Sequence, residues 1–199
     1  AQVCLEGKRP DRAVTYAERG LQASPGAKAA IHAQLHSIKG TALLEMGDVK
    51  GSVPSHRAAW RLMPEEPVYL NNLAFALAEL AENDVSLAEA EQLARDAVDK
   101  ATKAQAPGQT LGVFLDTLGW VQFRRGDLHS ASVNLAQAAD LAPGEAEILY
   151  HLACLRLAEG RRADAIVWLQ RAVKIKPDLG PAKKLLDEVT GYATPTLTA

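Results

Sequence analysis

The sequence lacks most of the motifs by which enzymes are recognised. It contains no Gly-rich phosphate loop, no nucleophile elbow and no paired metal-ligand motif. The two cysteines, Cys4 and Cys154, also show no metal-ligand spacing. We therefore expect a protein that is not an enzyme and that uses neither a cofactor nor a metal ion.

Long apolar runs and an excess of one charge are also missing. No stretch of 18 residues is uniformly apolar, which argues against direct insertion into a membrane. Lys and Arg number 22 and Asp and Glu number 24, so the formal net charge is -2. Because nucleic acid attracts proteins through basic surfaces, this balance argues against a nucleic-acid partner.

Aromatic residues are scarce, and what the chain has instead is a repeat built from small and aliphatic residues. The composition is 48% hydrophobic but only 5% aromatic, which favours closely packed helices and an all-α fold. A set of four residues recurs 34 positions later: Leu118, Gly126, Ala131 and Pro143 correspond to Leu152, Gly160, Ala165 and Pro177. A fixed period of this length predicts stacked units that bury their apolar faces against one another.

The repeat resembles that of the tetratricopeptide repeat family. The family pattern has a bulky residue, Leu-Gly three positions later, an aromatic residue, and then Ala, a large residue and Pro. Four copies fit it, with the bulky position at His36, Leu70, Leu115 and Leu149. The resemblance implies a right-handed α-solenoid of antiparallel helix hairpins, a TPR superhelix, with a C-terminal capping helix.

Small residues and turn residues fit such hairpins. Residues that allow two helices to approach closely recur at Gly40, Ala74, Gly119 and Ala153. The pairs Gly47-Asp48 and Gly126-Asp127 predict a helix C-cap followed by a turn. Pro54 is expected in the first turn of a helix that Ser52 caps.

We expect a single solenoid over residues 1–190, followed by a flexible tail over 191–199. The expected repeats are approximately 1–27 (partial), 28–66, 67–102, 110–145 and 146–179, with the capping helix at 180–190. Cys4 and Cys154 lie far apart in this arrangement, so no disulfide is expected. Because Gln2 to Glu6 has the pattern of the last turns of a helix, we also expect repeats upstream of Ala1.

Two histidines lie where this family usually has large core residues. They are His36 and His56, and the favoured interpretation is a mutual hydrogen bond in the core. A proton switch is one alternative, and a metal site that includes His32 is another.

The resemblance also implies a ligand-binding surface. In this family the first helix of each hairpin lines the concave face, and ligand contacts commonly fall one residue after the bulky position and four residues beyond that. These positions are Ser37 and Thr41, Asn71 and Phe75, Asp116 and Trp120, and Tyr150 and Cys154. The candidate peptide-binding residues are Asn71, Phe75, Asp116, Trp120 and Tyr150, with Arg124 as a charged rim.

Each candidate has a chemical role in this hypothesis. Asn71 would pair with the backbone of a peptide, Asp116 would accept from a backbone amide or a basic side chain, and the aromatic rings would hold apolar side chains. The alternative is that Phe75 and Trp120 only pack between neighbouring first helices.

The favoured function is a non-catalytic protein–protein interaction module, or scaffold, that binds a peptide segment of a partner in its concave groove. One alternative is a self-assembling scaffold that associates through its N-terminal edge, Gln2 to Ser24, where an apolar face would lack a neighbour. Another is the recognition arm of a larger enzyme. The runs from Tyr69 to Glu79 and from Leu115 to Trp120 resemble repeats of bacterial envelope proteins, including those of exosortase, exopolysaccharide and secretion systems, which implies the bacterial cytoplasm or envelope.

Overall fold

The computed structural model describes residues 2, 9–23, 26–81 and 83–191, and every regular element in these ranges is an α-helix. By its internal contacts the chain divides into two units, Ala1–Gln105 and Ala106–Ala199. Most of the segment from Gln2 to Glu6 and of the tail over 191–199 lies outside the described residues.

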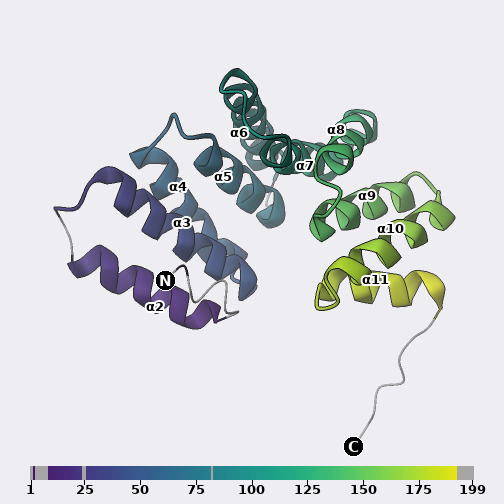
Figure 1. Cartoon of the computed structure of the whole chain (residues 1–199), viewed down its shortest axis with the longest axis horizontal. Coiled ribbons are helices and arrows are strands. Elements are labelled where there is room, and N and C mark those ends of the chain that lie inside the picture. The colour runs from purple at the N-terminus through teal and green to yellow at the C-terminus, as the bar shows by residue number, and fades with distance from the viewer. Residues whose placement is uncertain (1, 3–8, 24–25, 82, 192–199) are drawn as a thin grey trace, which may run out of the picture. The chain divides into compact units, whose positions relative to one another are not determined.

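Among its described residues, the first unit has two helix hairpins and one helix before them (Figure 1). Helices α3 and α4 form one hairpin and α5 and α6 the other, while α2 packs on α3 and α4 packs on α5. The bounds are α2 Pro10–Ala23, α3 Ala29–Glu45, α4 Val49–Leu62, α5 Pro67–Leu80 and α6 Asp84–Lys103.

In its described residues the second unit also has two helix hairpins, and these are followed by one further helix (Figure 1). Helices α7 and α8 form one hairpin, α9 and α10 form the next, and α11 packs on α10. The two first helices, α7 and α9, are also in contact. The bounds are α7 Gly108–Arg124, α8 Leu128–Leu141, α9 Ala146–Ala158, α10 Arg162–Ile175 and α11 Gly180–Thr190. These stacked hairpins confirm the all-α, solenoid fold class.

Small residues bring the two helices of each hairpin together, as predicted. A Cβ atom added to Gly119 of α7 would lie 2.7 Å from Cγ of Leu135 and 3.1 Å from its backbone nitrogen on α8. Such distances are shorter than van der Waals contact, so the two backbones can pack this closely only with glycine here. Ala131 and Ala165 are fully buried at the matching positions of α8 and α10.

The Gly-Asp pairs end one helix and begin the next. Gly47 and Gly126 both have φ of +81°, the left-handed conformation that closes a helix C-terminus and that glycine adopts without strain. The carboxylate of Asp48 then accepts from the backbone N–H of Gly51 at 2.9 Å, and that of Asp127 accepts from Ser130 at 3.0 Å. The predicted C-caps are confirmed, and each aspartate also caps the following helix.

The prediction for Pro54 was wrong by one turn. Because Asp48 provides the N-cap, α4 begins at Val49, and Pro54 lies inside the helix instead of in its first turn. Ser52 does not cap α4; its hydroxyl donates to the carbonyl oxygen of Val49 at 2.7 Å.

The predicted hydrogen bond between His36 and His56 is not present. His56 of α4 packs over Gly40 of α3, where an added Cβ would lie 2.6 Å from its ring. The side chain is almost fully buried, and neither ring nitrogen has a hydrogen-bond partner among the described residues. Burial disfavours the charged imidazolium and lowers the pKa of His56 to about 4.

Replacing Gly119 tests the close approach of α7 and α8. We expect Gly119→Ala to lower the free energy of unfolding by about 1–3 kcal/mol, because the new methyl group overlaps Leu135. The matched control is Gly180→Ala at the start of α11, where an added Cβ meets nothing within 4 Å. Urea unfolding should show the control as stable as the wild type or slightly more so; equal stability of Gly119→Ala would contradict the proposed packing.

Burial of His56 predicts a loss of stability in acid. Below pH 6.5 the unfolded chain binds a proton at this imidazole, whereas the folded chain binds it only near pH 4. The free energy of unfolding should therefore fall as the pH decreases through this window, by on the order of 3 kcal/mol from this group. In His56→Leu this part of the pH dependence should disappear, while the exposed His129→Leu should retain it. Urea midpoints at pH 7 and pH 4.5 measure the difference, and an unchanged pH dependence in His56→Leu would rule the mechanism out.

Candidate functional site

Four aromatic side chains from α7 and α9 form a cluster in the second unit. The ring of Trp120 stacks on His151, with centroids 4.1 Å apart and an interplanar angle of 17°. It also stacks on Phe123 at 5.1 Å, and the ring of Tyr150 lies tilted at 6.5 Å. We call these residues, Trp120, Phe123, Tyr150 and His151, the Trp120 cluster. Stacked and tilted arrangements at these distances are the favoured geometries of aromatic pairs, so the cluster fixes the positions of its members.

A buried hydrogen-bonded pair joins the same two helices. Nδ1 of His151 lies 2.9 Å and 3.0 Å from the two carboxylate oxygens of Asp116. Because an ionised carboxylate only accepts hydrogen bonds, Nδ1 carries the proton and donates it. Asp116 is 6% exposed, and His151 is similarly buried. The carboxylate that the sequence assigned to a bound peptide is therefore engaged within the fold.

The same kind of link occurs between first helices in the other unit. There Nδ2 of Asn72 on α5 donates to Oγ of Ser37 on α3 at 3.1 Å, across a sequence separation of 35 residues. Asp116 and His151 are also separated by 35 residues. In both units, a residue of one first helix thus bonds to a residue 35 positions later on the next first helix, one more than the repeat period of 34. A search at this separation from Asp116 would have found His151 in the sequence.

Trp120 is packed, whereas its neighbours reach the surface. Trp120 is 7% exposed, while Tyr150 and Arg124 are half-buried. The guanidinium carbon of Arg124 lies 5.7 Å from the centre of the Trp120 ring, a cation–π distance. The half-buried side chains of Arg124 and Tyr150 therefore both lie against the indole of Trp120.

A hollow of about 430 Å³ lies beside Tyr150, between α9 and α11. Pro181 and Leu185 supply apolar lining, and Lys184 and Glu188 supply charge. The charged ends of Lys184 and Glu188 lie 3.9 Å apart, and both side chains are largely exposed. The sequence prediction omitted these residues, although Lys184 follows Tyr150 by one full period of 34 and marks the continuation of the same stripe.

The remaining candidates belong to the first unit. Asn71 on α5 is 6% exposed, and its Oδ1 has no hydrogen-bond partner among the described residues. Phe75, one turn later on the same helix, is half-buried. The structure thus places Asp116, Trp120, Arg124 and Tyr150 together in the second unit, and Asn71 and Phe75 on one helix of the first.

Two further features of the described residues bear on function. No helix among them is long and apolar enough to cross a membrane. Within the same ranges, no group of three or more His, Cys, Asp or Glu side chains is arranged to hold a metal ion.

Comparison with known proteins identifies a family match in the second unit. The family model described as tetratricopeptide repeat matches residues 122–189, which include the second hairpin of the second unit and α11. Residues 122–189 thus match the tetratricopeptide repeat. No curated protein matches it.

Solved structures extend the tetratricopeptide fold over most of the chain. TTC0263, a thermophilic TPR protein of Thermus thermophilus, matches with a TM-score of 0.73 and 21% identity, covering 95% of this chain and 94% of that one. MamA 41-end from Desulfovibrio magneticus RS-1 matches at 0.60 and 17%, covering 90% and 92%. YrrB, described as a TPR protein with an unusual peptide-binding site, matches at 0.53 and 18%, covering 92% and 87%. Identities this low establish the fold alone.

The Asp116–His151 pair predicts a strongly coupled effect on stability. Asp116→Ala should lower the free energy of unfolding by roughly 1–3 kcal/mol, because it leaves a buried donor on His151 without its acceptor. Adding His151→Phe should restore part of this loss, since the ring can still stack on Trp120 and carries no polar atom. Thermal and urea unfolding of the single and double variants measure the coupling. If the stability changes of the two single variants add up to that of the double variant, the two side chains have no interaction energy.

Proposed function

We propose that this chain is a non-catalytic protein-binding module and that its second unit binds a segment of a partner protein along α7, α9 and α11. One observation carries the proposal. Tyr150 belongs both to the Trp120 cluster and to the lining of the hollow beside α11, so a rigid aromatic platform adjoins an accessible depression. Solenoids of this kind use their extended concave surfaces for binding.

The residues of this surface divide into two roles. Trp120 and Asp116 are packed and hold α7 against α9, so they position the surface instead of meeting the ligand. Tyr150 and Arg124 are half-buried and present their outer edges to a ligand. Aromatic and arginine side chains held in this way are typical of residues that dominate binding energy at protein interfaces.

The hollow suggests the chemistry of the bound segment. Pro181 and Leu185 favour an apolar side chain, and the Lys184–Glu188 pair at the edge favours polar groups on either side of it. We propose that the partner inserts an apolar residue beside Tyr150 while its backbone follows α9.

In the first unit, we propose that Asn71 and Phe75 form a separate, smaller peptide contact. The unpartnered Oδ1 of Asn71 supports this assignment, because a backbone N–H of a peptide would satisfy it. The oxygen is covered in the structure, so its use requires a rotation of the side chain. The peptide-binding site described for YrrB, which has the same fold, makes peptide recognition the most direct hypothesis.

Affinity capture from a lysate of the source organism tests this function. The wild-type chain should retain a defined protein, and Tyr150→Ala should reduce its capture at least tenfold. The matched control is Tyr16→Ala on α2, where the tyrosine is 46% exposed and lies outside the proposed surface. Circular dichroism should show equal helicity for all three chains. Capture by Tyr150→Ala at the wild-type level would remove this surface from consideration.

A further inference from the structure

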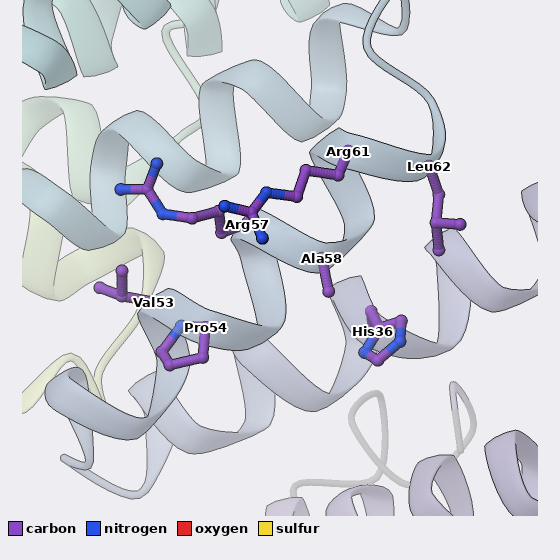
Figure 2. Close-up of a pocket in the computed structure, with 7 residues that line it drawn as sticks. All are labelled: His36, Val53, Pro54, Arg57, Ala58, Arg61 and Leu62. Carbon is purple, nitrogen blue, oxygen red and sulfur yellow. The ribbon is translucent and has the colours of Figure 1, made fainter.

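A second depression, of about 470 Å³, lies in the first unit between α3 and α4 (Figure 2). Its apolar surface comes mainly from α4, where Pro54, Ala58 and Leu62 follow one another at intervals of four residues and so share one stripe of the helix. Because alanine stands between two larger residues, the stripe is indented at its middle. Val53 and His36 complete the lining, and Figure 2 shows His36 reaching it from α3. We call this depression the α4 groove.

Two arginines border the α4 groove, and they differ in their partners. The guanidinium of Arg57 donates to both carboxylate oxygens of Glu89 on α6, at 2.5 Å and 3.0 Å. This bidentate pair raises the pKa of Arg57, lowers that of Glu89, and holds the arginine in place. Arg61, one turn later, is exposed, and within the described ranges it has neither an ion pair nor a hydrogen bond.

The net charge of the groove therefore comes from Arg61. The charge of Arg57 is compensated by Glu89. Burial, together with the nearby positive charges of Lys39 and His32, lowers the pKa of His36, so this ring is neutral at pH 7. An apolar depression bordered by a single uncompensated guanidinium complements an apolar side chain that lies next to a carboxylate.

We propose that the α4 groove is a second docking site, which binds a segment of a partner protein carrying leucine-like side chains beside Asp or Glu. The apolar side chain fills the indentation over Ala58, and the carboxylate accepts hydrogen bonds from the guanidinium of Arg61. The volume lies within the range of roughly 300–1,000 Å³ that is typical of ligand pockets. A small molecule is disfavoured, because such sites need several convergent polar groups, and of the two guanidinium groups here that of Arg57 is already engaged by Glu89. The site is separate from the proposed function, which concerns the second unit.

Fluorescence anisotropy with two probe peptides tests the docking site. Each peptide has twelve residues with leucines at intervals of three and four, flanked in one by glutamates and in the other by lysines. The wild-type chain should bind the glutamate peptide at least tenfold more tightly than the lysine peptide. Arg61→Glu should abolish this preference, and Ala58→Leu should weaken binding at least tenfold by filling the indentation.

Two controls separate this site from other effects. Lys183→Glu on α11, an exposed lysine in the second unit, changes the net charge of the chain by the same amount as Arg61→Glu and should bind as the wild type does. Tyr150→Ala should also leave peptide binding unchanged, so failure here is distinguishable from failure of the proposed function. Binding of the glutamate peptide no tighter than that of the lysine peptide, or unaffected by Arg61→Glu, overturns the proposal. A dimer in light scattering that Arg61→Glu disperses would assign the groove to a second copy of the chain and also overturn it.

Discussion

The fold depends on how closely the two helices of each hairpin approach. Where Gly119 faces Leu135, and where Gly40 faces His56, there is no room for a single extra carbon atom. This contact fixes the height and rotation of the first helix relative to the second. Every residue that the first helix presents, including those of the Trp120 cluster, takes its direction from that constraint.

A second layer of interactions joins neighbouring hairpins. The links Ser37–Asn72 and Asp116–His151 connect consecutive first helices at the same offset, although their chemistry differs. Both place polar partners between helices that are otherwise packed through apolar residues, so each specifies which residues of the two helices face each other. In the second unit, the alignment of α7 with α9 that the Asp116–His151 bond specifies also brings Trp120 beside Tyr150.

The features that follow from the repeat length and from the size of side chains could be predicted from the sequence. Those that depend on which side chains pair with each other could not. The 34-residue repeat, the small residues and the Gly-Asp turns sufficed for the fold class and the hairpin turns. The role of Asp116 was harder to predict, because its partner His151 lies one residue beyond the repeat period and resembles no motif. The start of α4 was misplaced because Asp48 and Ser52 are both good capping residues, and only the geometry of the preceding turn selects the aspartate. The α11 residues that line the hollow beside Tyr150 were not among the candidates, because half a repeat was interpreted as a cap alone.

The burial of His56 without a hydrogen-bond partner has a consequence for how the first unit moves. In a solenoid the stability of each hairpin comes from its own contacts and from those with its immediate neighbours. An unfavourable interaction in one hairpin is therefore not offset by distant repeats. The α3–α4 hairpin, which carries two unsatisfied ring nitrogens between its helices, should therefore open locally more readily than it would with an apolar side chain at position 56. Amide protons of α3 and α4 would then exchange with solvent sooner than they would with an apolar residue at position 56.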